Sequence, residues 1–350
     1  MLRRRDMQRV LEHSQELWNR FRRRLDGVDQ PAFLCLVVIC QAVTVLVTWR
    51  LWQIHRSPPM LPALPLPELN LGVIILVSLA TIFVRPLAGL ILHTIAILYS
   101  ILIDQSRLQP EIISMVILMW GSFRSPGLKL IARSHLVSLW FFAGLNKLLS
   151  AGYLNSISLA HPRSSSRVVL LPLVELTLGI LALVPRSRNF AAALAFATHI
   201  TIFAFVLRGK PDSPVLFWNL ALAFAGFALV SSWSRSLPSS LKELNPVTAS
   251  VVLMVLISPI GFYFGLFDAY LSHNLYSKSI PTAIWYRASG KHESINTWNT
   301  LNVPLPPEHR LYEAYFNNSC ERGDFLIIHD PRHWARWRGY AERRVDCVRQ

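Results

Sequence analysis

Three ionisable residues lie inside successive apolar segments, where a lipid-facing helix would carry hydrocarbon. Lys147 lies near the end of FFAGLNKLLS, Glu175 lies within LPLVELTLGI, and His199 lies within FATHITIFAF. A lysine withdrawn from water gives up its proton more readily and can act as a base, and a neighbouring carboxylate or imidazole can tune it. We therefore expect Lys147, Glu175 and His199 to form a buried, proton-handling catalytic cluster.

Each of these residues also has a structural interpretation. Lys147 could run its stem along the helix and raise its ammonium to the interface. Glu175 could form a structural ion pair, and His199 could be a hydrogen-bonded packing residue. Ionisable side chains inside spans are nonetheless rare and commonly mark function. Outside the apolar segments, Asp104 and Arg107 are three residues apart and could pair within an ordinary loop.

The segment of Lys147 carries two further residues that could bind a ligand. Arg133 precedes Lys147 by fourteen residues, close to four helical turns, so the two lie near one face of a helix. Gly144 follows Ala143, and such small residues let another backbone or a flat ligand approach closely.

The composition indicates a membrane protein. The chain has 350 residues, of which 52% are hydrophobic and only 16% charged, and its mean hydropathy is +0.37. Soluble domains carry about a quarter charged residues. The formal charge of +15 lies largely in the N-terminal arm, the short loops and the tail, where positive side chains face anionic headgroups. We therefore expect contact with a lipid bilayer and no binding of nucleic acid.

Apolar runs of roughly 17–25 residues are long enough to span a bilayer as helices. They predict an all-α, polytopic transmembrane helical bundle of about nine spans, with a small α+β extramembrane tail at the C-terminus. The second and third spans are joined only by Arg85 and Pro86, and the fourth is short enough to be re-entrant, so eight spans is an alternative. The expected spans are 31–49, 68–84, 87–103, 110–122, 134–150, 168–185, 189–207, 214–231 and 247–267.

The chain divides into a basic arm (1–29), a membrane domain (30–270) and a polar tail (271–350). The arginine-rich arm is expected in the cytoplasm, as a helix on the membrane surface or as a flexible segment. Nine spans then place the tail outside the cytoplasm, in a multi-pass protein of the cell membrane. Within the tail, 323–330 is expected to form a short strand and 332–344 a short helix.

The cysteines and short motifs exclude several classes of protein. Cys320 and Cys347 could pair if the tail lies in an oxidising compartment, whereas Cys35 and Cys40 are expected to be small buried hydrophobes. The sequence contains no CxxC, GxSxG, HExxH, P-loop or GxGxxG motif and no metal-ligand spacing. Hydrolase, protease and nucleotide-driven activities therefore have no support, and no metal is expected.

The segment RSHLVSLWFFAGLNKLLSAGYL resembles the signature span of the vitamin K-dependent gamma-carboxylase family and its bacterial relatives, the HTTM (horizontally transferred transmembrane) domain proteins. The next spans are also similar, because one carries an acidic residue and the following one a histidine. The resemblance covers roughly residues 30–270. The matching residues of the signature span are Arg133, Ala143, Gly144, Lys147 and Leu148.

The resemblance implies a function for these residues. Lys147 would be the base that deprotonates a reduced quinone, either menaquinol or vitamin K hydroquinone, and Arg133, Glu175 and His199 would position or tune it. Arg133 and Gly144 would then belong to the cofactor-binding surface. The tail of about 80 residues is much shorter than the lumenal region of the carboxylase, so the same membrane chemistry could serve another substrate.

Two alternatives remain at the level of sequence. One is a non-catalytic membrane component resembling DoxX- or MauE-type proteins, which support redox partners. The other is a small-molecule transporter, which typically shows broken helices at matching positions of two halves. Arg85 and Pro86 interrupt one half, and no matching interruption occurs in the other.

Overall fold

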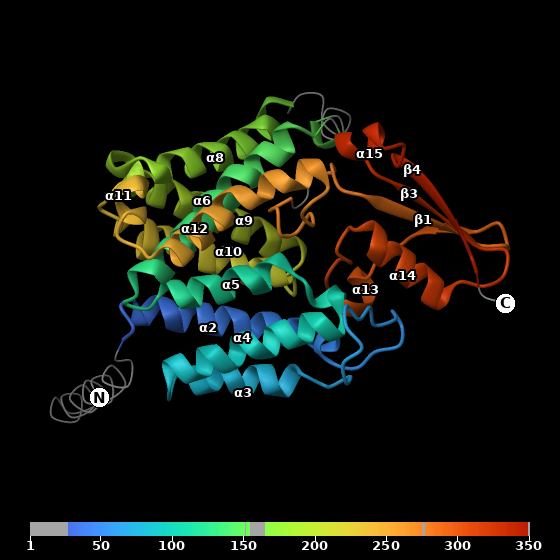
Figure 1. Ribbon diagram of the computed structural model, residues 1–350, viewed down its shortest axis with the longest axis horizontal. Coiled ribbons are helices and arrows are strands. Elements are labelled where there is room, and N and C mark those ends of the chain that lie inside the picture. Colours follow the sequence, from blue (N-terminus) through green and yellow to red (C-terminus); the bar gives the residue numbers. More distant parts are fainter. Residues whose placement is uncertain (1–26, 151, 155–164, 275–276, 349–350) are drawn as a thin grey trace, which may run out of the picture.

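The computed structural model describes residues 27–150, 152–154, 165–274 and 277–348, with only the backbone described for 165–169. The basic segment 1–26, predicted to be a surface helix or a flexible arm, lies outside the described residues. A bundle of roughly parallel and antiparallel helices forms one end of the molecule, and a small cap of strands and short helices forms the other (Figure 1).

The bundle is mostly α-helical, as predicted. Five helices are long and apolar enough to cross a membrane, and four apolar helices within the described residues are shorter. The π-helix η4 (Gly226–Ser231) extends α10, and the 3-10 helix η5 (Ser258–Phe264) extends α12. The main helices are α2 (Pro31–Val47), α3 (Gly72–Ile82), α4 (Pro86–Ile103), α5 (Pro110–Gly121), α6 (Pro126–Leu148), α8 (Ser165–Leu183), α9 (Arg188–Gly209), α10 (Pro214–Ala225) and α12 (Pro246–Ile257).

Proline marks the start of many of these helices because its fixed φ suits the first turn, where its missing N–H is not needed. Six helices begin in this way, at Pro31, Pro86, Pro110, Pro126, Pro214 and Pro246. Side-chain caps add to the signal at two of them. Ser125 accepts a hydrogen bond from the Leu128 N–H before α6, and Asn245 accepts one from the Thr248 N–H before α12.

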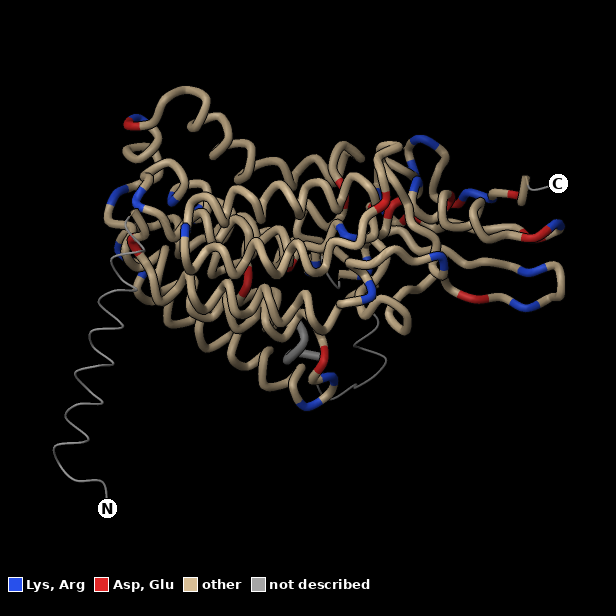
Figure 2. Tube along the Cα trace, turned by 90° about the horizontal axis from the view of Figure 1, so that it is seen from below, with Lys and Arg blue, Asp and Glu red and all other residues tan. Residues whose placement is uncertain are grey.

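The outer surface of the bundle is apolar. Phe205 on α9 and Val247 on α12 are 79% and 75% exposed. Lys, Arg, Asp and Glu lie mainly at the two ends of the molecule, with few along the helices between them (Figure 2). An apolar band between two charged ends is the pattern expected of a protein that contacts the bilayer through its helices.

The cap contains one antiparallel four-stranded sheet in the order β2-β1-β3-β4. Trp285, Phe316, Leu326 and Ile328 are buried between the sheet and α14, and a disulfide joins Cys320 to Cys347. The strands are β1 (Thr282–Tyr286), β2 (His292–Ser294), β3 (Phe325–His329) and β4 (Glu342–Asp346), and the helices are α13 (Trp298–Leu301), α14 (His309–Ser319) and α15 (His333–Trp337).

The cap confirms one sequence prediction and corrects another. The strand expected within 323–330 is β3. The helix expected over 332–344 is wrong in its second half, because α15 ends at Trp337 and 342–346 form β4. Gly339 has a φ of 75°, which ends the helix in a conformation that glycine adopts freely. The chain then turns back to pair with β3, and tertiary pairing overrides the local helical pattern.

A return segment, residues 265–274, leads from η5 back into the molecule before the cap begins. Gly265 has a φ of 71°, which allows the reversal of the chain. Ala269, Ser272 and Asn274 of the return segment are fully buried. The Ser272 carbonyl accepts a hydrogen bond of 3.1 Å from the Asn146 side chain on α6. The stretch that follows η5 is therefore buried against the bundle.

Candidate ligand pocket

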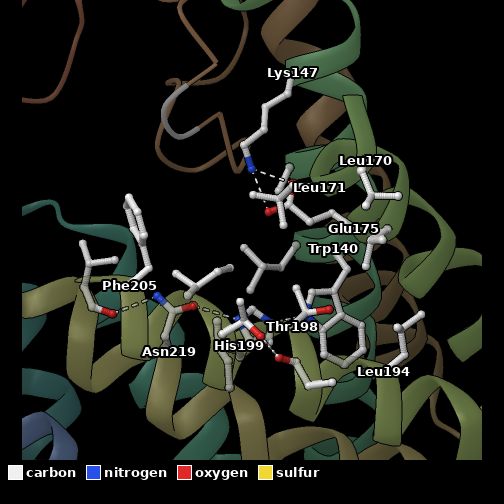
Figure 3. Close-up of a pocket in the computed structure, with 18 of the residues that line it drawn as sticks. Trp140, Lys147, Leu170, Leu171, Glu175, Leu194, Thr198, His199, Phe205 and Asn219 are labelled. Atoms are coloured by element: carbon white, nitrogen blue, oxygen red, sulfur yellow. Dashed lines mark hydrogen bonds and ion pairs between the residues drawn. The ribbon is translucent and has the colours of Figure 1, made fainter. Parts of the chain in front are cut away.

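A cavity of about 630 Å³ lies between α6, α8, α9 and α10. Its walls are mostly apolar, and ionisable groups lie on two sides of it, as Figure 3 shows. The volume falls within the range of about 300–1,000 Å³ that is usual for small-molecule sites. Apolar residues of its wall include Leu139, Ala143, Val174, Leu194, Ile202 and Leu222.

Lys147 of α6 and Glu175 of α8 form an ion pair in the wall of this pocket (Figure 3). The ammonium donates to both carboxylate oxygens, at 2.7 Å and 2.6 Å. The two side chains are only 9% and 10% exposed. Their charges cancel, which is the arrangement that a water-poor cavity tolerates. The Lys147 side chain therefore reaches Glu175. Among the described residues, the third N–H of its ammonium has no hydrogen-bond acceptor.

The close contact of α6 with α8 brings this pair together. A Cβ on Gly144 would lie 2.4 Å from the Pro172 carbonyl oxygen, and one on Gly179 would lie 2.7 Å from Phe141 Cβ. Only glycine allows the backbones to approach so closely at these two points. Gly144 therefore faces α8 and does not line the pocket, so its effect on the site is to set the distance between two helices.

His199 of α9 lies on the other side of the pocket, with both ring nitrogens engaged. The Trp140 indole N–H donates to Nε2 at 2.9 Å, and Nδ1 lies 2.8 Å from the Asn219 side-chain oxygen. This network assigns the ring proton to Nδ1. Asn219 in turn donates to the Val215 carbonyl at 2.9 Å. The imidazole is held in one orientation by α6 and α10.

The pocket opens towards the apolar surface of the bundle. Leu170 on α8 and Phe205 on α9 both line it, and they are 59% and 79% exposed. A molecule dissolved in the bilayer could therefore enter between α8 and α9 without crossing water. This route favours a lipid-soluble ligand over a polar one.

Arg133 lies away from this pocket, near the opposite end of α6. Its Nε–H donates to the Leu229 carbonyl at 2.8 Å, and its guanidinium carbon lies 5.6 Å from the centre of the Trp233 ring. The structure thus brings Lys147, Glu175 and His199 to one pocket and places Arg133 elsewhere.

Sequence reasoning assigned no role to three residues that shape the site. Trp140 and Asn219 hold His199. Asn146 is held by η5 and the return segment, because its oxygen accepts a 2.5 Å hydrogen bond from the Tyr263 hydroxyl and its amide N–H donates to the Ser272 carbonyl. Asn219 is an amide within the apolar stretch PVLFWNLALAFA, a signal that could have drawn attention. Asn146 is a polar residue in an apolar segment, one position before Lys147, but its partners lie more than a hundred residues away in the sequence.

A second group of buried charges lies near the cap, around the 3-10 helix η2 (Gln105–Arg107). Asp104 and Arg107 are both fully buried and lie 3.6 Å apart, so they pair as the sequence suggested. His55 approaches Asp104 at 3.0 Å, and the Arg107 guanidinium donates to the carbonyls of Leu51 and Gln53. This segment forms a packed junction and is far from an ordinary loop.

Over the part of the chain that the structure describes, no three His, Cys, Asp or Glu side chains are arranged to hold a metal ion. Comparison of the chain with protein-family models, with curated proteins and with solved structures finds no match. Fold and composition therefore define only a class, that of multi-helix membrane proteins, here with a small C-terminal cap that holds a four-stranded sheet.

Proposed function

We propose that this chain is a multi-pass membrane protein of the gamma-carboxylase-like (HTTM) type whose pocket binds a reduced, lipid-soluble quinone and takes a proton from it. The observation that carries the proposal is the Lys147–Glu175 pair in the wall of an apolar cavity that opens towards lipid. The activity would be that of a quinol-dependent membrane oxidoreductase or carboxylase-like enzyme. A quinol supplies a weakly acidic ring hydroxyl to such a site.

The pocket fits such a ligand in size and in chemistry. Its volume of about 630 Å³ accommodates a fused aromatic ring and the start of a prenyl chain. Leu170 and Phe205 lie where such a chain would leave towards the bilayer. The free N–H of Lys147 can meet a ring oxygen, and the aromatic face of Trp140 lines the same cavity.

The proton-handling role is proposed for the Lys147–Glu175 pair acting as a unit. Lys147 donates a hydrogen bond to the ligand oxygen and stabilises negative charge that develops there. The proton that leaves the hydroxyl passes to the pair, so that its net charge rises by one while the ligand becomes an anion beside it. His199 acts as a positioning residue, because both of its nitrogens already hold protein partners.

We also propose nine spans, with the basic arm in the cytoplasm and the cap outside. The disulfide between Cys320 and Cys347 supports this orientation, because disulfides persist in oxidising compartments. Maleimide labelling of sealed vesicles before and after reduction tests it. Reduction should expose two thiols on the extracytoplasmic side, and reduced cap thiols on the cytoplasmic side would contradict the orientation.

The functional test is binding and oxygen-dependent turnover of menaquinol by the purified protein in lipid nanodiscs. Trp140 lines the pocket, so quenching of tryptophan fluorescence reports binding. Lys147→Met should abolish turnover. Because it leaves Glu175 buried without its partner, the double variant Lys147→Met/Glu175→Gln is measured beside it, and it should fold yet remain inactive.

Lys129→Met is the matched control, because Lys129 also lies on α6 and pairs with a carboxylate, that of Asp29, outside the pocket. It should bind and turn over menaquinol as the unaltered protein does. Equal turnover in Lys147→Met and in the unaltered protein would refute the proposal.

A non-catalytic lipid-binding component is the second candidate, resembling the DoxX- or MauE-type proteins. The observation that favours it is the closed network around His199, which holds the ring without leaving a nitrogen free for a ligand. Menaquinol that binds with saturation but is never consumed would favour this candidate.

A further inference from the structure

A second polar cavity of about 330 Å³ lies at the end of the bundle remote from the cap. The start of α6, the loop after η4 and the segment between α11 (Leu237–Leu241) and α12 surround it. Figure 2 shows Lys and Arg gathered at this end of the bundle. Four cationic side chains line the cavity, those of Arg124, Lys129, Arg133 and Arg235, together with one carboxylate, that of Glu243.

The charges in this cavity do not balance. Lys129 pairs with Asp29, and Arg235 pairs with Glu243. Within the described parts of the chain, neither Arg124 nor Arg133 lies in an ion pair with a carboxylate. Arg133 interacts at longer range with the Asp29 carboxylate that pairs with Lys129, so among the described residues the four cations face two carboxylates, Asp29 and Glu243. Such a surface attracts an anion.

Arg133 is held in this cavity by the ring of Trp233, which Arg188 also contacts. Its guanidinium carbon lies 5.6 Å from the centre of the Trp233 ring, and that of Arg188 lies 3.7 Å from the same ring. Arg188 also donates to the carbonyls of Ala182 and Arg235, at 2.9 Å and 2.7 Å, and so fixes the position of the Trp233 ring between the two arginines.

Few of the Arg133 donors are used inside the protein. Its Nε–H donates to the Leu229 carbonyl at 2.8 Å, and one Nη2–H lies 3.3 Å from the Ser232 hydroxyl. The remaining N–H groups of a planar guanidinium suit the two oxygens of a phosphate.

We propose that this cavity binds the phosphate group of an anionic membrane lipid. The cavity lies at the end of apolar helices, which is the depth of the lipid headgroups. Leu244 lines it, and Val247 three residues later is 75% exposed, so apolar surface for an acyl chain begins beside the phosphate site. The site is independent of the quinol pocket, because none of the residues of one lines the other.

The test measures retention of short-chain phosphatidylglycerol by the purified full chain in neutral detergent, by native mass spectrometry. Phosphatidylcholine and inorganic phosphate are the two comparison ligands. The variant Arg124→Gln/Arg133→Gln should raise the Kd for phosphatidylglycerol by about tenfold or more, because two charge-assisted contacts are lost. Arg124→Gln alone changes only an exposed side chain and should raise Kd by about threefold to fivefold.

Arg186→Gln is the matched control, since Arg186 is exposed at the same end of the bundle but does not line the cavity. It should leave the Kd unchanged. An equal loss in the control and in the double variant, or equal retention of phosphatidylcholine, would overturn the site. Saturable binding of inorganic phosphate with no retention of the lipid would overturn the lipid assignment and leave a site for free phosphate.

Discussion

Two pairs of buried opposite charges lie in this bundle, and their surroundings differ. Lys147 and Glu175 meet in the wall of a cavity, and the lysine ammonium donates two hydrogen bonds to the Glu175 carboxylate. Asp104 and Arg107 lie in packed protein, where backbone groups of two other segments surround them. The first pair lies beside space for a ligand, whereas the second joins segments of packed protein and leaves one buried nitrogen of Arg107, Nη1, without an acceptor among the described residues.

The two pairs show that a buried charge in a membrane protein is interpreted best from its surroundings. Burial and pairing occur at both places, so neither distinguishes a functional site from a structural one. What distinguishes them is whether space for another molecule lies next to the pair, as it does at Lys147 and Glu175. By this measure Lys147 is a candidate functional residue, whereas Arg107 has a structural role and binds the segment around Leu51 and Gln53 through its hydrogen bonds.

The largest expected effect comes from breaking the packed junction. Asp104→Ala removes the partner of Arg107 and of His55, and also the acceptor for the Leu61 and Ser106 N–H groups. We expect a loss of about 3–5 kcal/mol in the free energy of unfolding, because a buried guanidinium is left uncompensated. Thermal unfolding in detergent measures it, and an unchanged midpoint would contradict the structural role of this pair.

The pocket pair should be easier to replace. Lys147→Met should cost about 2–3 kcal/mol, because Glu175 remains buried without a donor. Adding Glu175→Gln should restore most of that loss. The parallel double variant Asp104→Asn/Arg107→Met should not recover, because the carbonyls of Leu51 and Gln53 lose their donor. Chemical denaturation of Asp104→Ala, Lys147→Met and the two double variants measures these losses, and equal recovery at both places would contradict the structural difference between the two pairs.

A third buried carboxylate, Glu308 of the cap, should make stability depend on pH. It accepts a hydrogen bond from the Ala269 N–H at 2.8 Å and lies 3.7 Å from the Arg332 guanidinium, with Asp268 and Arg310 close by. Burial raises the pKa of Glu308 from 4.5 to about 7 in spite of these arginines.

The folded protein therefore binds the Glu308 proton more tightly than the unfolded chain does. Its contribution to stability is complete below pH 4.5 and is lost as the pH rises towards 7. Glu308→Gln should stabilise the protein at pH 8 by about 1–3 kcal/mol and have little effect at pH 4. Unfolding midpoints across this range test it, and a variant that gains nothing at pH 8 would contradict the raised pKa.

The smallest expected effect concerns the support of His199. Trp140→Phe removes the indole donor and should cost about 1 kcal/mol of stability. It also frees the Nε2 atom towards the pocket, so the affinity for menaquinol should change while the fold is kept. Fluorescence of the remaining tryptophans would be too indirect here, so binding is measured with radiolabelled menaquinol. An affinity equal to that of the unaltered protein would separate His199 from the ligand.

The sequence predicted the helical elements well because lipid-facing and core positions are both apolar along these runs, which leaves long uniform segments. It also predicted that Lys147, Glu175 and His199 belong together, since rare ionisable residues in successive helices tend to meet. It could not place Arg133, because fourteen residues of helix put it near the face of Lys147 but some 20 Å away along the axis. Nor could it predict the partners of Asn146, which depend on the path of a distant segment.

The return segment has a consequence for how the protein is made. Asn146 sits beside Lys147, yet its two partners, Tyr263 and Ser272, leave the ribosome more than a hundred residues later. Before these two residues are synthesised, the Asn146 side-chain amide on the apolar helix α6 lacks both of these hydrogen-bond partners. Synthesis of η5 and of the segment behind it therefore completes the hydrogen bonds next to Lys147, so a chain that terminates before them lacks both partners of Asn146.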